Sequence, residues 1–98
     1  MTINKTENGA SVIVAIEGRL DTTTAPQLEA ELKAVLAGIT DLTLDLAGLE
    51  YISSAGLRVL LHAQKTMNRQ GEMKVTGVSD AVMEIFEITG FNEVLNIV

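Results

Sequence analysis

Hydrophobic and polar residues alternate over two short runs near the start of the chain, at positions 2–7 and 11–17. This period of two predicts a pair of β-strands. Asn8-Gly9 between the runs is the strongest local signal for a hairpin, with a type I′ turn. The second run is apolar on both of its faces, so we expect it inside a sheet that helices cover on at least one side.

Apolar residues then recur at helical spacing. The first stripe, at i, i+4, i+7 and i+8, is typical of a helix that faces a core. It consists of Leu28, Leu32, Val35 and Leu36. Thr24 with Gln27 fits a capping box at the start of this helix, and Gly38 indicates its end.

The rest of the chain predicts strands over 41–46, 73–76 and 94–98 and helices over 53–70 and 79–90. The element order is then ββαβαβα(β). Each strand–helix–strand unit crosses over right-handed, which places parallel strands side by side with helices packed on the sheet. We therefore expect one small α/β domain with a mixed sheet, whose helices are too few to cover both faces.

Composition narrows the classes of function. Aromatic residues are only 3% of the 98 residues and the net charge is −6, which argues against direct nucleic-acid binding. The chain has no cysteine, and His62 is its only histidine, so thiolate chemistry and histidine-based metal sites are excluded. We expect no cofactor, although nucleotide binding stays open. Without a signal peptide or a membrane-spanning apolar run, a cytoplasmic protein without membrane contact is expected.

The segment 45–57, Asp-Leu-Ala-Gly-Leu-Glu-Tyr-Ile-Ser-Ser-Ala-Gly-Leu, carries the candidate chemistry. Its two serines stand where a helix begins, and a helix N-terminus favours anionic groups. Such a serine is a helix cap, a nucleophile or a phosphorylation site. His62 lies eight residues after Ser54, about 12 Å along a helix, too far to activate that hydroxyl. Capping, at about 1 kcal/mol, is the simplest interpretation of the serines alone.

Several motifs in order resemble the STAS domain family, and more narrowly the bacterial anti-sigma-factor antagonists. They are Gly-Arg-Leu-Asp at 18–21, the segment 45–57, Gly-Glu-Met at 71–73 and Ile-Thr-Gly-Phe at 88–91. The resemblance covers essentially all of residues 1–98. It implies a single STAS domain with a four- or five-stranded sheet and helices largely on one face.

The resemblance also implies a function called partner switching. An unphosphorylated antagonist binds an anti-sigma factor with serine kinase activity and thereby frees a sigma factor. The kinase inactivates the antagonist by phosphorylating one serine, and a PP2C-type phosphatase restores it. Aligning the family's D-S-S-G or D-S-T-G motif on Gly56 places the phosphorylated residue at Ser54. Ser53 then stands where the family has aspartate, and Ala55 replaces the second hydroxyl residue. Ser53 is therefore a minor alternative for the phosphorylated residue.

The partner surface implied by the resemblance has two parts. One is the strand–helix loop with Asp21, Thr22 and Thr23, although such residues are often only turn and capping groups. The other is the start of the second helix. It comprises Ser53, Ser54, Leu57, Arg58 and Leu61.

Leucines at helical spacing are usually core residues, so Leu57 and Leu61 are either core or partner contacts. Arg58 is either a partner contact or a solvated charge. Two further classes of function remain open. One is a STAS scaffold or ligand-sensing module in another system, such as a lipid-transport accessory protein. The other is a small hydrolase that uses Ser54.

Overall fold

The computed structural model describes residues 1–98 and contains one four-stranded sheet. The strands are β1 (Thr2–Asn8), β2 (Ser11–Leu20), β3 (Asp41–Ile52) and β4 (Glu72–Thr76). The helices are α1 (Ala25–Leu36), α2 (Ser54–Asn68), α3 (Asp80–Thr89) and α4 (Phe91–Val94). The strands lie in the order β1-β2-β3-β4, with β1 antiparallel to β2 and the other pairs parallel. The predicted mixed sheet is confirmed.

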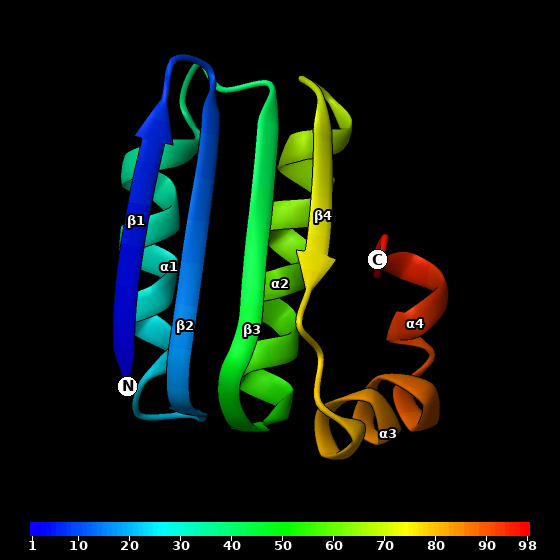
Figure 1. Ribbon diagram of the computed structural model, residues 1–98. Helices are drawn as coiled ribbons and strands as arrows, with labels where there is room; N and C mark the ends of the chain where they lie inside the picture. Colours follow the sequence, from blue (N-terminus) through cyan, green and yellow to red (C-terminus); the bar gives the residue numbers. More distant parts are fainter.

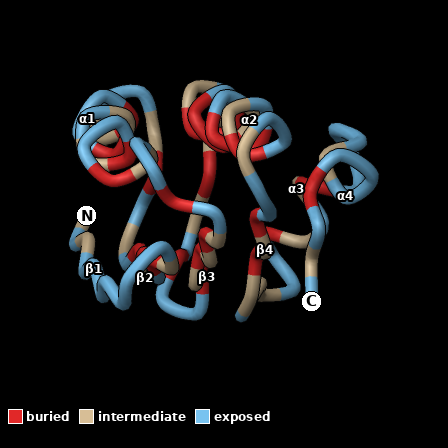
Figure 2. Tube along the Cα trace, turned by 90° about the horizontal axis from the view of Figure 1, so that it is seen from above, coloured by how far each residue is buried: buried red, intermediate tan, exposed pale blue.

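Helices α1 and α2 pack side by side on one face of this sheet, while α3 and α4 lie beyond its β4 edge (Figures 1 and 2). The buried residues lie mainly between the sheet and the two long helices (Figure 2). The core consists of 24 buried apolar residues, of which only Phe86 is aromatic, as the composition predicts. The predicted placement of helices largely on one face is confirmed. None of the helices is both long and apolar enough to cross a lipid bilayer.

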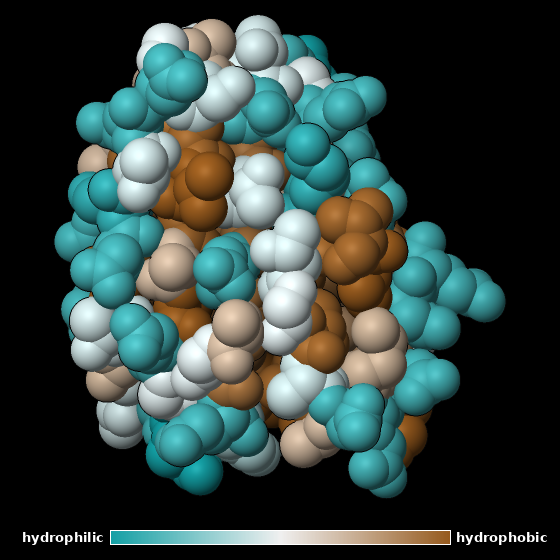
Figure 3. Space-filling view, viewed as in Figure 1, coloured by the Kyte–Doolittle hydropathy of each residue, from teal (hydrophilic) through white to brown (hydrophobic).

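The opposite face of the sheet carries no helix. It presents hydrophilic groups with separate hydrophobic patches among them (Figure 3). Ile13 of β2 belongs to this face and is 46% exposed. Both faces of β2 are apolar in the sequence although helices cover only one, because an apolar residue of β2 also lies on the uncovered face.

Two predictions of local geometry are wrong. Gly9 and Ala10, not Asn8 and Gly9, form the two-residue hairpin loop, since Asn8 pairs with Ser11. Of these two loop residues, Gly9 has a positive φ and Ala10 does not, which is the pattern of a type II′ turn. The capping box of α1 is also absent, because the Thr24 side chain makes no cap hydrogen bond to the helix.

Strand β3 runs six residues beyond the predicted end at Leu46, to Ile52. The expected strand over 94–98 does not form. Helix α4 occupies part of that segment, and the chain makes only an isolated parallel bridge between Val75 and Ile97.

Candidate functional site

The carboxyl ends of β2, β3 and β4 lie at the same edge of the sheet, the lower edge in Figure 1. Each strand continues from there toward the start of a helix: α1, α2 or α3. This edge therefore gathers the loop after β2 and both serines at the start of α2.

Ser53 is the N-cap of α2. Its backbone is extended, with φ −96° and ψ 176°, and its Oγ accepts a hydrogen bond of 3.4 Å from the Gly56 N–H. Its own N–H donates to the Leu20 carbonyl at 2.9 Å. This second bond ties the start of α2 to the end of β2, one residue before Asp21. Serine and aspartate cap helices about equally well, so Ser53 performs the capping that an aspartate would perform here.

Ser54 differs from its neighbour. It is the first residue of α2, it is exposed, and its hydroxyl makes no hydrogen bond within the chain. The two serines therefore have separate environments: one hydroxyl is used in holding the helix, and the other is available to solvent and to another protein.

Gly56 allows α2 to approach the sheet closely. A Cβ atom there would lie 2.6 Å from Leu20 Cγ and 2.9 Å from Ile52 Cγ1, closer than real Cβ contacts. Both neighbours are buried at the ends of β2 and β3. A side chain at position 56 would push the first turn of α2, and with it Ser54, away from the sheet.

Strand β3 reaches this contact through two irregularities. Its register against β2 shifts between Ala15 and Glu17 and again between Gly18 and Arg19. At each shift β3 contains one more residue than β2, which is a β-bulge. As a result, the buried residues at the end of β3 are three apart, at Leu46, Leu49 and Ile52, instead of two apart.

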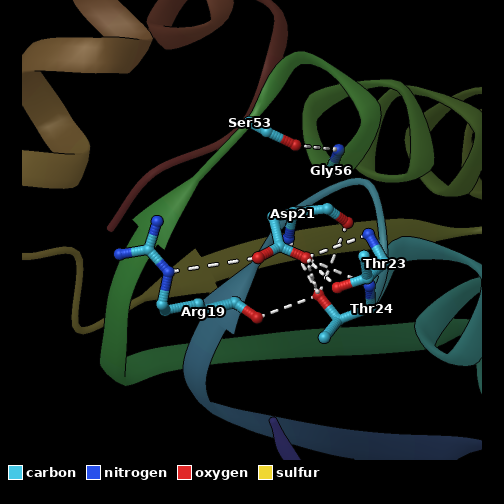
Figure 4. Close-up of polar contacts among 6 residues, drawn as sticks. All are labelled: Arg19, Asp21, Thr23, Thr24, Ser53 and Gly56. Carbon is cyan, nitrogen blue, oxygen red and sulfur yellow. Dashed lines mark hydrogen bonds and ion pairs between the residues drawn. The ribbon is translucent and has the colours of Figure 1, made fainter.

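Asp21 organises the loop after β2 (Figure 4). Its Oδ1 accepts hydrogen bonds from the backbone N–H and the hydroxyl of Thr23, at 3.0 and 2.7 Å, and from those of Thr24, both at 3.2 Å. The Thr23 hydroxyl is the largest cause of a lowered pKa of Asp21, and partial burial opposes the shift. The single proton of the Thr24 hydroxyl is shared between this carboxylate and the Arg19 carbonyl, whose oxygen lies 2.9 Å from Thr24 Oγ1. These bonds fix the loop in one arrangement.

Two residues that the sequence analysis missed lie beside this loop. The Arg19 guanidinium lies over the Tyr51 ring, with Cζ 4.4 Å from the ring centroid. Its Nε is 4.0 Å from Asp21 Oδ2 (Figure 4). Arg19 and Tyr51 are register partners only because of the second bulge, so no spacing rule in the sequence identifies the pair.

The structure places most predicted partner residues at this one edge. Thr22 and Thr23 are exposed, Asp21 is half-buried, and Arg58 is exposed about one turn after Ser54. Leu61 is half-buried. Leu57 is only 5% exposed and belongs to the core, so its prediction as a surface contact is wrong. Its helical spacing serves packing on the sheet.

A family model described as "Mlab, STAS domain" matches residues 3–98. The chain belongs to the STAS domain family. It is 45% identical over 82 residues to BtrV of Bordetella bronchiseptica, a proposed anti-sigma factor antagonist, covering 82% of this chain and 71% of that protein. It is 36% identical over 87 residues to the anti-sigma-B factor antagonist of Listeria monocytogenes, covering 86% and 75%.

Among solved structures, the anti-sigma factor antagonist SpoIIAA has the same fold at 15% identity. Its unphosphorylated form matches with a TM-score of 0.77 over 99% of this chain and 87% of that one. Its phosphorylated form, from Bacillus, matches with the same TM-score of 0.77 over 99% and 91%. The predicted resemblance to the STAS family and to its anti-sigma-factor antagonists is confirmed.

The close approach at Gly56 is testable by Gly56→Ala. We expect a loss of about 1–3 kcal/mol in the free energy of unfolding, because the added methyl overlaps buried side chains. Ser54→Ala is the matched control in the same turn, since its side chain is exposed, and it should stay within about 0.5 kcal/mol of the wild type. Denaturant unfolding of both variants measures this. Equal stability of Gly56→Ala and the wild type would contradict the packing argument.

The Asp21 loop is testable by comparing two neighbouring threonines. Thr23→Val removes the main hydrogen bond to Asp21 and should raise the pKa of that carboxyl toward its ordinary value of 3.8, as measured by NMR titration. Thr22→Val should leave it unchanged, because Thr22 is exposed and makes no hydrogen bond to Asp21.

The sign of the accompanying stability change follows from the direction of the shift. A carboxyl whose pKa is lower in the folded state stabilises the fold above its unfolded-state pKa, and this contribution is lost as the pH falls through the folded-state pKa. The charge-dependent stability difference between wild type and Thr23→Val should therefore be complete above pH 3.8 and be lost as the pH falls through the lower pKa of the folded wild type. A difference that persists unchanged into strong acid would show that the loop does not depend on the ionised carboxyl.

Proposed function

We propose that this protein is an anti-sigma-factor antagonist whose binding to its anti-sigma factor is switched off by phosphorylation of Ser54. The single observation that carries the proposal is the contrast between the two serines. Ser53 is engaged as the cap of α2, whereas the Ser54 hydroxyl is exposed and unbonded at the first residue of the helix. Modification of Ser54 leaves this cap in place, whereas modification of Ser53 would replace the capping hydroxyl.

In the proposed cycle, the unmodified protein binds an anti-sigma factor with serine kinase activity and frees the sigma factor in the cytoplasm. The same kinase then phosphorylates Ser54, and a PP2C-type phosphatase removes the phosphate. The relatives named as anti-sigma factor antagonists support this cycle for the chain. In it the protein acts by binding, and catalysis belongs to the partners.

The helix start is suited to a phosphate. The modification adds about −1.5 to −2 charges, which the positive end of the helix dipole favours. Arg58 lies four residues later on the exposed surface of α2, the spacing at which side chains on a helix meet. The cap at Ser53 is untouched by the modification. SpoIIAA has this fold in both its unphosphorylated and its phosphorylated form.

Phosphorylation of Ser54 affects binding to the anti-sigma factor more strongly than it affects the fold. A complex that covers Ser54 has to strip water from the phosphate or place it against partner groups. For a micromolar complex, a binding free energy of about −8 kcal/mol, a penalty of about 4 kcal/mol raises Kd about a thousandfold. One local change of charge therefore exchanges partners without a change of conformation.

The site of modification is tested by incubating the protein with its anti-sigma factor kinase and ATP, followed by peptide mass spectrometry. The added phosphate should be on Ser54. Ser54→Ala should remain unmodified and keep its binding to the kinase. Ser53→Ala is the matched control: it should lose about 1 kcal/mol of stability with its cap and still be phosphorylated at position 54.

Phosphate on Ser53, or no phosphate when a bound kinase is present, would overturn the assignment. Binding of wild type only to proteins of another class would favour the alternative of a STAS scaffold or sensing module.

The separation of docking from folding is tested by Ser54→Asp. Its negative charge should weaken binding to the anti-sigma factor by tenfold or more, as measured by calorimetry, because the carboxylate enters the covered surface. Its thermal midpoint should remain close to that of the wild type, since an acidic residue is favoured at a helix start. Ser54→Asn, which is similar in size and neutral, is the control for shape. A large loss of thermal stability in Ser54→Asp would contradict the proposal.

A further inference from the structure

Arg19 is a cation that the fold holds in position at the edge occupied by Ser54. Its side chain is 61% exposed, and it is the penultimate residue of β2, where the register places it opposite Tyr51. The Tyr51 ring supports the guanidinium from β3. Asp21 approaches its Nε, and that carboxylate is itself fixed by hydrogen bonds from Thr23 and Thr24 (Figure 4).

The outer nitrogens of this guanidinium make no hydrogen bond within the chain, and in Figure 4 they point away from the Asp21 loop. A guanidinium presents its donors in a planar fork that matches a carboxylate. Because the ring and Asp21 already orient the fork, little rotational freedom is left to lose on binding.

Few other cations stand at this edge. Three of the seven basic side chains are paired elsewhere on the chain: Lys5 with Glu31, Lys33 with Glu29 and Lys74 with Asp41. Two more, Lys65 and Arg69, lie at the far end of α2. Arg19 and Arg58 remain at the edge with Ser54, on a chain whose net charge is −6.

We propose that Arg19 recognises a carboxylate on the anti-sigma factor and that Tyr51 is the residue that positions it. This inference rests on the proposed function, since it assigns one contact of the same complex. It makes Arg19 a determinant of specificity: an anti-sigma factor with an acidic residue opposite is accepted, and one with a basic residue there is rejected.

The test compares the dissociation constants of full-length variants for the purified anti-sigma factor kinase of the same organism. Arg19→Gln should weaken binding about tenfold or more, the usual effect of losing a charged hydrogen bond. Arg19→Lys should be intermediate, because it keeps the charge and loses the fork. Lys65→Gln removes the same charge from an exposed position far from the edge and should change binding less than twofold. Thermal unfolding checks that each variant is folded.

The role of Tyr51 is tested by a double-mutant cycle with Tyr51→Leu. If Tyr51 acts through Arg19, Tyr51→Leu weakens binding in the wild-type background and has no effect in Arg19→Gln. An equal loss in both backgrounds would overturn the positioning role and make Tyr51 a direct partner contact.

The outcomes separate the two proposals. Absence of binding by the wild type would overturn the proposed function. Normal wild-type binding with an unchanged Arg19→Gln, or an equal loss in Lys65→Gln, would overturn the inference about Arg19 alone. The inference would also fail if Arg19→Gln bound normally when unmodified and differed from the wild type only after phosphorylation, because Arg19 would then contact the phosphate.

Discussion

The close contact between the first turn of α2 and the ends of β2 and β3 determines the geometry of the whole candidate site. Gly56 leaves no room for a side chain between the helix and its two buried neighbours, Leu20 and Ile52. The hydrogen bond from the Ser53 N–H to the Leu20 carbonyl closes the same contact through the backbone. As a result, the loop that follows β2 and the exposed hydroxyl of Ser54 are held in a fixed relation by rigid elements.

In the proposed function, helix stability and signalling depend on two different, adjacent residues. The hydroxyl that stabilises the helix belongs to Ser53, and the hydroxyl proposed to change its charge belongs to Ser54. Had one residue served both purposes, each phosphorylation would have replaced the neutral capping hydroxyl by a charged phosphate. Because the roles are divided, the charge of the surface can change by about two units while the buried contacts behind it stay the same.

The sequence allowed most of the architecture to be predicted because hydrophobic periodicity reports burial directly. The stripe in α1 and the alternation of Leu42, Leu44 and Leu46 each record which side faces the core. Prediction failed where the hydrophobic period is interrupted. Two bulges change the spacing of buried residues in β3 from two to three, so the strand was ended too early at Leu46. The short helix α4 was missed because four residues carry no helical period.

Some residues of the candidate site could likewise be predicted from the sequence, and others could not. The Asp21 loop and the two serines have local signals in the sequence, since caps and turns act over three or four residues. The burial of Leu57 has no such signal, because one helical stripe fits both core and surface.

The sequence analysis did not identify Arg19 as a site residue, for a different reason. Its orientation comes from Tyr51, which the bulged register brings opposite, and from Asp21, which its own loop immobilises. The guanidinium takes this fixed orientation only after the sheet has formed. The same bulges that break the hydrophobic period also bring Tyr51 opposite Arg19 at this edge. Irregular strand pairing therefore orients a charged side chain that the regular register of the sheet would have left without this neighbour.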